Sequence, residues 1–200
     1  MKHIYFGVLA LVMSLQHPAF AAGGGGDSTS PPKQTQTTQD CFAERQWDPE
    51  IQRYVRYAEK VNGVWDPKLR RCIRPDKAGY LQSNLLEDAV RELAYAGRLA
   101  EAQLVLAQMD ASSDFVLTYW GFTHRKQGDQ LLADRFYSAA LSKNPDNLLT
   151  RSYMGQGLVV QGDFIGARDQ LLEIRARGGE GTWAEFALLG AIETGTGYDY

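Results

Sequence analysis

The chain has 200 residues with 24 acidic side chains against 21 lysines and arginines, a net charge of −3, three histidines and two cysteines. Its basic residues do not gather in a block, so the composition argues against nucleic-acid binding, which needs concentrated positive charge. After residue 21, no stretch approaches the roughly 20 apolar residues that cross a bilayer, so no transmembrane segment is expected there.

The first 21 residues follow the pattern of a cleaved secretory signal. Lys2 precedes an apolar run from Ile4 to Leu15, and the small-residue triplet Ala19-Phe20-Ala21 ends the segment. The run suits a signal peptide and is short for a membrane anchor, with an uncleaved N-terminal anchor as the alternative. We therefore expect residues 1–21 to be removed from an exported protein, periplasmic or secreted.

Cleavage of that signal would leave 20 basic and 24 acidic side chains, a net charge of −4, with His124 as the remaining histidine. One histidine cannot build a multi-histidine metal centre. The glycine stretches lack the lysine and the strand-to-helix context of a phosphate loop, and no serine stands in a G-x-S-x-G elbow. The sequence therefore predicts a non-enzymatic protein with no cofactor and no catalytic or metal-binding residues.

Composition divides the exported chain into four parts. Residues 22–40 are rich in glycine, proline and small polar residues and predict a disordered linker. Residues 41–78 are rich in aromatic and charged residues and contain both cysteines, whereas residues 79–194 form Leu- and Ala-rich stretches broken at glycine-containing dipeptides. We expect a small cysteine module, then a helical domain, then a flexible tail over residues 195–200.

Cys41 and Cys72 bracket the small module and predict a disulfide, because an exported chain with an even number of cysteines can form and keep one. Closing a loop of 31 residues would stabilise the module by roughly 3 to 4 kcal/mol. Inside the loop, apolar residues at spacings of three and four predict a helix over Glu50–Val61, with Asp48 as its N-cap. The run Val64–Ile73 is compatible with a short β-hairpin.

Two tryptophans of the module, Trp47 and Trp65, each begin a Trp-Asp-Pro sequence. In one interpretation they form a miniature core under the disulfide and seal the open end of the helical domain. In the other, the stretch around Trp65 resembles the glycine, aromatic, aspartate and cysteine pattern of small disulfide-tied carbohydrate-binding modules. That resemblance implies that the tryptophans stack on the sugar rings of peptidoglycan or another polysaccharide.

Breaks between the Leu- and Ala-rich stretches recur at intervals of 31 and 34 residues, and an alanine stands five residues after each break glycine. A period near 34 with paired amphipathic stretches predicts repeated helix hairpins. The breaks are Gly97-Arg98, Gly128-Asp129 and Gly162-Asp163, and the alanines are Ala102, Ala133 and Ala167.

One segment, Asp114–Asn147, carries an ordered series of large and small residues: Leu117, Trp120-Gly121, His124, Ala133, Tyr137, Ala140 and Pro145. The series has the spacing of the W-x2-L-G-x2-Y element and of the later small, aromatic and proline positions of the tetratricopeptide repeat family, which the segment therefore resembles. Weaker copies begin near Ser83 and at Leu148, and Thr182–Thr194 resembles a capping helix. The resemblance implies an all-α fold, a right-handed α-solenoid of about three helix hairpins plus a capping helix.

Small residues in the repeats predict close packing of helices. Gly121 and Gly155 would let a partner helix approach, and Ala133 would keep the crossing of two helices thin. The substitutions Gly121→Leu and Ala133→Phe are therefore expected to unfold the array.

In the tetratricopeptide family, the first helices of successive repeats line a concave groove that receives a peptide or a helix of a partner. Members that bind chaperone tails use a lysine and an asparagine in this groove. Glu87 and Arg91 replace that pair in one repeat, and Thr118 and Phe122 replace it in the next. Binding of an acidic chain terminus in the manner of those members is therefore not expected. Phe122 is either an interaction anchor or a packing residue for a neighbouring element. By position, the groove residues are Glu87, Arg91, Ala94, Tyr95, Phe115, Thr118, Phe122, Arg125, Lys126, Ser152, Gln156, Val159 and Val160.

These patterns lead to two hypotheses for function. The first is an exported protein-interaction module or scaffold in the cell envelope, whose groove binds another envelope protein or a peptide segment. The second is a carbohydrate- or cell-wall-binding protein that uses Trp47 and Trp65, with the repeats as scaffold. An enzyme subunit without an active site of its own is a third alternative.

Overall fold

The computed structural model describes residues 33–42, 45–48, 53–56 and 63–198; the predicted signal peptide and most of the predicted linker lie outside these ranges. The described residues are mainly helical, which confirms the all-α prediction at that level. Among them, no helix combines the length and the apolar character that crossing a bilayer requires. The α-helices are α2 (Ser83–Tyr95), α3 (Leu99–Leu106), α4 (Asp114–Lys126), α5 (Gln130–Lys143), α6 (Leu148–Val160), α7 (Phe164–Ala176) and α8 (Trp183–Thr194).

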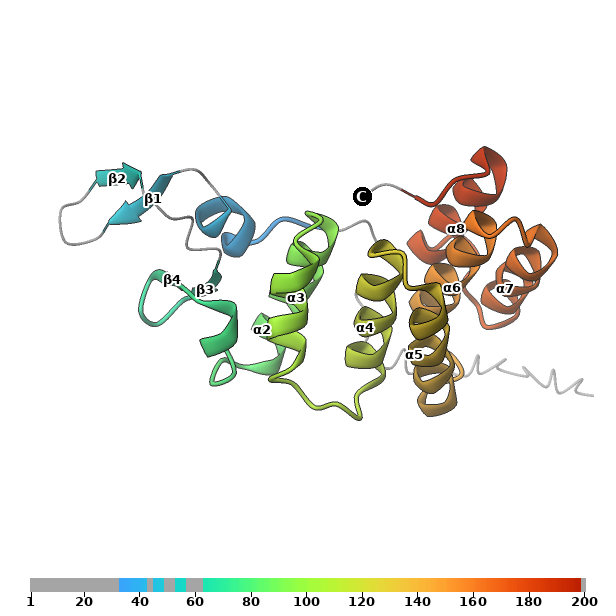
Figure 1. Ribbon diagram of the computed structural model, residues 1–200, viewed down its shortest axis with the longest axis horizontal. Coiled ribbons are helices and arrows are strands. Elements are labelled where there is room, and N and C mark those ends of the chain that lie inside the picture. Colours follow the sequence, from blue (N-terminus) through green and yellow to red (C-terminus); the bar gives the residue numbers. More distant parts are fainter. Residues whose placement is uncertain (1–32, 43–44, 49–52, 57–62, 199–200) are drawn as a thin grey trace, which may run out of the picture.

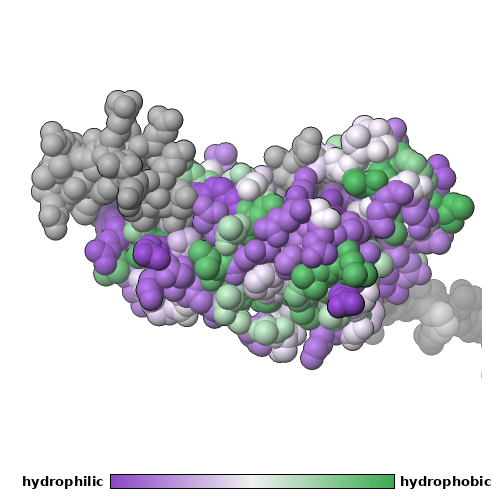
Figure 2. Space-filling view, viewed as in Figure 1, coloured by the Kyte–Doolittle hydropathy of each residue, from purple (hydrophilic) through white to green (hydrophobic). Residues whose placement is uncertain are grey.

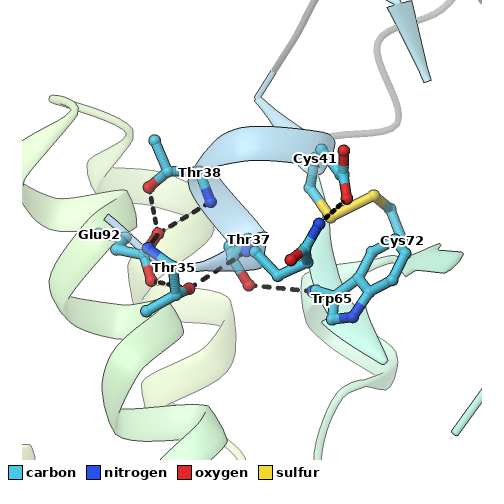
Figure 3. Close-up of a disulfide and its surroundings, with 9 residues drawn as sticks. Thr35, Thr37, Thr38, Cys41, Trp65, Cys72 and Glu92 are labelled. Atoms are coloured by element: carbon cyan, nitrogen blue, oxygen red, sulfur yellow. Dashed lines mark hydrogen bonds between the residues drawn. A yellow bond between two sulfur atoms is a disulfide. The ribbon is translucent and has the colours of Figure 1, made fainter. Parts of the chain in front are cut away.

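The N-terminal module contains two short antiparallel hairpins. The predicted disulfide joins Cys41 to Cys72, with their Cα atoms 5.6 Å apart (Figure 3). Trp65 lies opposite Cys72 in the second hairpin, which confirms the hairpin expected over Val64–Ile73. The hairpins are β1 (Arg45–Asp48) with β2 (Arg53–Arg56), and β3 (Val64–Asp66) with β4 (Arg71–Ile73); the short helix η2 (Pro75–Lys77) follows β4.

The first hairpin corrects the helix predicted over Glu50–Val61. Arg53–Arg56 forms β2, paired antiparallel with β1, and Asp48 is the last residue of β1 and not a helix N-cap. Tyr54 and Val55 belong to residue types that favour strands, and apolar residues over so short a segment fit either period. The rest of the predicted helix lies outside the described residues.

The end of the predicted linker is also ordered, because a helical turn, η1 (Thr37–Cys41), packs on α2. The backbone amides of Thr35 and Thr38 donate hydrogen bonds of 3.1 and 2.8 Å to the carboxylate of Glu92, and both threonine hydroxyls also bond to it (Figure 3). Glu92 is 7% exposed. An acceptor at the start of a helical turn satisfies amides that have no partner inside the turn. The prediction of disorder up to Asp40 is therefore wrong for this last part.

Four helices begin at side-chain caps, and three end at the break glycines identified in the sequence. The side chains of Asp129, Asn147, Asp163 and Thr182 accept hydrogen bonds from amides in the first turns of α5, α6, α7 and α8. The three break glycines lie between α2 and α3, α4 and α5, and α6 and α7, at φ of +72°, +90° and +82°. Glycine adopts this left-handed conformation without strain, so it ends each helix sharply.

Successive helices pack in a row that extends away from the N-terminal module (Figure 1). α2 packs on α3, α4 on α5, and α6 on α7, whereas α8 packs on both α6 and α7. A Cβ atom on Gly121 would lie 2.5 Å from Cε1 of Tyr137 in α5, and one on Gly155 would lie 2.6 Å from Cδ1 of Leu188 in α8. Both glycines therefore stand at close contacts between helices.

The main core continues from the N-terminal module into α6. Val64 of β3, Leu93 of α2, Tyr137 of α5 and Tyr153 of α6 are all fully buried members of it. Two smaller apolar clusters join α6, α7 and α8. On the face shown in Figure 2, hydrophobic residues form separate patches among hydrophilic ones. The module is thus continuous with the helices through its apolar contacts.

The segment after α8 is packed as far as the structure describes it, which corrects the prediction of a flexible tail from residue 195. Gly195 caps α8 in the left-handed conformation. The ring of Tyr198 lies edge-on to Trp183, with centroids 5.2 Å apart, and its carbonyl oxygen accepts a hydrogen bond of 3.2 Å from Lys126 of α4. The segment therefore connects α8 with α4.

Candidate functional site

Five aromatic side chains from three helices contact one another, and we call them the aromatic face. Phe115, Tyr119 and Phe122 recur at the spacing of one helical stripe on α4. Tyr95 comes from the end of α2 and Tyr153 from the middle of α6. These are the helices that the sequence assigns to the groove, and three of the five residues, Tyr95, Phe115 and Phe122, are predicted groove residues.

The rings of the aromatic face contact one another directly. Phe122 lies 5.7 Å from Tyr95, 6.0 Å from Tyr119 and 4.8 Å from Tyr153, measured between ring centroids. The hydroxyl of Tyr95 is 3.0 Å from that of Tyr119 and is also hydrogen-bonded to that of Tyr153. One tyrosine from each of the three helices therefore joins a shared network, which fixes the rings relative to one another.

Burial separates the base of this face from its edge. Tyr119, Phe122 and Tyr153 are 0% exposed, whereas Tyr95 and Phe115 are half-buried. Of the two roles that the sequence allows for Phe122, packing is therefore the one that the structure shows. Tyr95 and Phe115 are the aromatic members that still expose part of their surface.

Three neutral polar residues of the predicted groove, Thr118, Ser152 and Gln156, are buried beside the aromatic face. The hydroxyl of Thr118 lies 2.6 Å from that of Thr150 in α6. Gln156, also in α6, donates a hydrogen bond of 3.3 Å to Ser152 and accepts one of 3.4 Å from Arg125. These side chains connect α4 to α6 and do not form an open wall, so Thr118 and Gln156 act here in packing.

Basic side chains border the aromatic face at both ends. Arg91 of α2 lies 5.9 Å from the centroid of Phe115 and forms an ion pair of 2.5 Å with Asp88. The guanidinium of Arg125 lies 5.4 Å from the centroid of Phe122, and the ammonium of Lys126 lies 6.0 Å from it. Cations at such distances are attracted to aromatic rings. Glu87, the acidic residue predicted for the groove, is half-buried on α2.

Arg125 is the most enclosed of these cations, at 9% exposed. Its Nε donates a hydrogen bond of 3.3 Å to the hydroxyl of Tyr137, and its Nη2 donates to Gln156. Burial raises the pKa of Tyr137 to about 12, although the positive charge of Arg125 opposes that rise. Tyr137 is therefore neutral at physiological pH and accepts the hydrogen bond as a phenol.

A cavity of about 400 Å³, which we call the end cavity, lies next to Arg125. It is formed where the last turns of α4 and α6 meet the start of α5 and the segment after α8. Sequence analysis identified three of its residues, Arg125, Lys126 and Val160, as groove residues. The lining residues are Arg125, Lys126, Gly128, Gln130, Val160, Gln161, Thr196 and Gly197.

The predicted alternative site in the cysteine module is only partly described. The side chain of Trp47 lies outside the described residues, so the pairing of Trp47 with Trp65 stays a prediction. Trp65 is half-buried, and its backbone amide donates a hydrogen bond of 3.0 Å to the hydroxyl of Thr37 (Figure 3). In the described part of the chain, no group of three histidine, cysteine or acidic residues is arranged to hold a metal ion.

Sequence analysis missed Tyr119 and Tyr153, the two tyrosines at the base of the aromatic face. A signal for them exists, because they stand 34 residues apart and so occupy the same position in successive repeats. Gln130, Thr196 and Gly197 of the end cavity carry no such signal, since they come from the start of α5 and from the segment after α8. Comparisons of the chain with family models, with curated proteins and with solved structures find no match.

Proposed function

We propose that the chain is an exported, non-enzymatic interaction module of the tetratricopeptide type, whose aromatic face binds an extended segment of another envelope protein. The observation that carries the proposal is the joining of Tyr95, Tyr119 and Tyr153 from α2, α4 and α6 through their hydroxyl groups. Three successive first helices thereby contribute to one aromatic cluster, and first helices are the elements from which the family builds its groove.

The chemistry of this surface suits a peptide. The buried rings of Tyr119, Phe122 and Tyr153 form a rigid base, and the accessible atoms of Tyr95 and Phe115 offer apolar contact beside hydrogen-bonding groups. Rigid aromatic side chains give a large contact area and lose little conformational entropy on binding. Arg91 and Lys126 at the two ends would add donors for the carbonyl oxygens of an extended chain.

A peptide selection tests the proposal. Random peptides displayed on phage would be selected against the disulfide-bonded protein, and the affinity of the enriched peptides would be measured by isothermal titration calorimetry. We expect Phe115→Ala and Lys126→Glu each to weaken binding at least about tenfold, which is about 1.4 kcal/mol. Leu131→Ala and Arg135→Glu on α5, both at exposed positions, are the matched controls and should leave affinity unchanged.

Two results would contradict the proposal. One is a set of enriched peptides that binds all four variants like the wild type while circular dichroism shows intact helices, since binding would then lie away from the aromatic face. The other concerns export: N-terminal sequencing of the protein from cells should find a chain that begins near Ala22, and retention of Met1 would argue against the cleaved signal.

A further inference from the structure

The end cavity has the size of a site for part of a peptide. Its volume of about 400 Å³ falls within the roughly 300 to 1,000 Å³ typical of ligand pockets. A water molecule occupies only about 30 Å³, so a small inorganic ion would leave most of the cavity unfilled. One or two amino-acid residues would fill it better.

The lining of the end cavity is positively charged. Its described lining residues are basic, neutral polar, glycine or valine, and none of them is acidic. Arg125 brings the most enclosed positive charge, and its only hydrogen-bond partners among the described residues are the neutral groups of Tyr137 and Gln156. Within the described residues, no carboxylate lies within ion-pair distance of Arg125. Enclosing a cation in this way is costly unless an opposite charge or several hydrogen bonds compensate it.

One nitrogen of Arg125 is left to face the cavity. Nε and Nη2 are used by Tyr137 and Gln156, but Nη1 has no hydrogen-bond partner among the described residues. A Cβ atom on Gly197, one of the lining residues, would lie 3.5 Å from Nη1, which places this nitrogen at the cavity wall. The residue at this point of the wall is thus a glycine, which leaves room beside the guanidinium.

The other walls offer a peptide both apolar and polar contact. Val160 is 64% exposed at the end of α6, and it lines the same cavity. Thr196 and Gly197 belong to the segment after α8, which is held in place by the packing of Tyr198 on Trp183 and by its hydrogen bond from Lys126. These contacts hold this wall of the cavity against α4 and α8.

We propose that the end cavity binds the carboxylate side chain of an aspartate or glutamate in an extended peptide, with Nη1 of Arg125 as the anion-binding group. Guanidinium groups bind carboxylates through strong, charge-assisted hydrogen bonds. The inference rests on the proposed function and names the partner class for one end of its surface. The Arg125 guanidinium also lies over the ring of Phe122, so the cavity adjoins the buried base of the aromatic face.

To test the proposed carboxylate site, the full, disulfide-bonded protein is titrated with four probes, and the titrations are followed by nuclear magnetic resonance. The probes are N-acetyl-Gly-Phe-Asp-Gly-amide, its asparagine counterpart N-acetyl-Gly-Phe-Asn-Gly-amide, sodium acetate and inorganic phosphate. We expect the aspartate peptide to shift the amide signals of Gly128, Gln161 and Thr196 and to bind about tenfold more tightly than the asparagine peptide. Acetate and phosphate should bind at least about tenfold more weakly than the aspartate peptide, because they leave the apolar wall unused.

Variants of Arg125 test whether its guanidinium group is responsible for the preference for the aspartate peptide. Arg125→Met should abolish the preference for aspartate, and Arg125→Lys should retain part of it because the charge remains without the planar guanidinium. Arg168→Met, at an exposed position on α7, is the control and should keep the full preference. Thermal melts identify any variant that loses its fold, and the comparison of the two peptides on the wild type needs no variant at all.

The outcomes separate this inference from the proposed function. Equal binding of the two peptides, with shifts confined to Phe115 and its neighbours, would overturn the carboxylate site and leave the aromatic face supported. Acetate or phosphate binding as tightly as the aspartate peptide would also overturn it, since the site would then serve small anions. Absence of binding by either peptide overturns it as well, whereas the peptide selection decides the proposed function independently.

Discussion

Gly121 shows how one residue sets the distance between two helices. Tyr137, whose ring faces it from α5, is fully buried and also accepts the hydrogen bond from Arg125. The ring therefore has no space into which it can move if a larger residue replaces the glycine. Gly155 differs, because its neighbour is the flexible end of Leu188.

A series of glycine-to-alanine variants tests this contact. Gly121→Ala should destabilise the protein by about 2 kcal/mol, because extra atoms in a packed interior cost roughly 1 to 3 kcal/mol. Gly155→Ala should cost less, since the end of Leu188 can rotate away. Gly190→Ala in α8 is the control: among the described residues its Cβ would meet only Tyr198, at 3.9 Å, so the gain in helix propensity should leave stability unchanged or higher. Urea unfolding followed by circular dichroism measures all three, and equal losses would contradict this account.

Glu92 has a comparable role for the N-terminal segment, because its carboxylate accepts hydrogen bonds from two amides and two hydroxyls. Glu92→Gln replaces one acceptor oxygen by a donor, so it should weaken the docking of η1 by about 1 to 2 kcal/mol. Hydrogen exchange should then be faster at the amides of Thr35 and Thr38. Asp88→Asn on the same helix is the control, since Asp88 pairs with Arg91, and it should leave the exchange of these two amides unchanged.

The roles of Gly121 and Glu92 differ in how far the sequence alone could predict them. The glycine at position 121 belongs to a repeated pattern of large and small residues, so its role in close packing follows from spacing alone. The contact between Thr35 and Glu92 joins residues 57 positions apart in unlike segments. No period or composition indicates it, because it depends on how the disulfide-tied module is placed against α2.

At the scale of elements, long periodic segments were predicted well and short ones were not. The stretch of residues 79–194 repeats its pattern over many turns, and its helices form on either side of the predicted breaks. The segment around β1 and β2 has only a few apolar residues, and these fit a helical stripe as well as a strand. Residues 53–56 form a strand because they pair with β1, and the local spacing of apolar residues does not indicate that pairing.

The start of α8 gives a pH-dependent prediction at the same scale. Thr182 and Glu185 form a reciprocal cap: the amide of Glu185 donates to the hydroxyl of Thr182, and the carboxylate of Glu185 accepts from the amide of Gly181 at 2.7 Å. The hydrogen bond from Arg175 is the largest influence that lowers the pKa of Glu185 below its ordinary value of 4.5, followed by the bond from Gly181. The native state therefore favours the ionised carboxylate.

A lowered pKa means that this carboxylate stabilises the fold above the pKa of the unfolded chain and ceases to do so as the pH falls through the native pKa. Glu185→Gln should cost about 1 kcal/mol at neutral pH, mainly from the cap, because Arg175 is partly exposed and its ion pair is screened. The difference from wild type should shrink towards pH 3. Glu193→Gln, at an exposed position near the end of α8, should show no such loss, and a difference independent of pH would contradict the assignment.

At the scale of the whole molecule, the helices form a row in which each pair contacts mainly its neighbours. Stability in such arrays is approximately a sum of local terms, so distant parts respond separately to a perturbation. The aromatic face crosses this row, because it takes residues from α2, α4 and α6. Its geometry consequently depends on the middle of the array more than on the N-terminal module or on α8.

Removal of the disulfide tests whether the module is a separable unit. Replacing Cys41 and Cys72 by serine opens a loop of 31 residues and should remove roughly 3 to 4 kcal/mol of stabilisation from the module. Hydrogen exchange should then accelerate at the amide of Trp65, which bonds to Thr37 across the module, while the amide of Leu188 in α8 stays protected. Binding of the selected peptides should persist, because α4 and α6 supply most of the aromatic face. A uniform loss of protection over all helices would show instead that module and array unfold as one cooperative unit, and peptide binding would then fall together with the module.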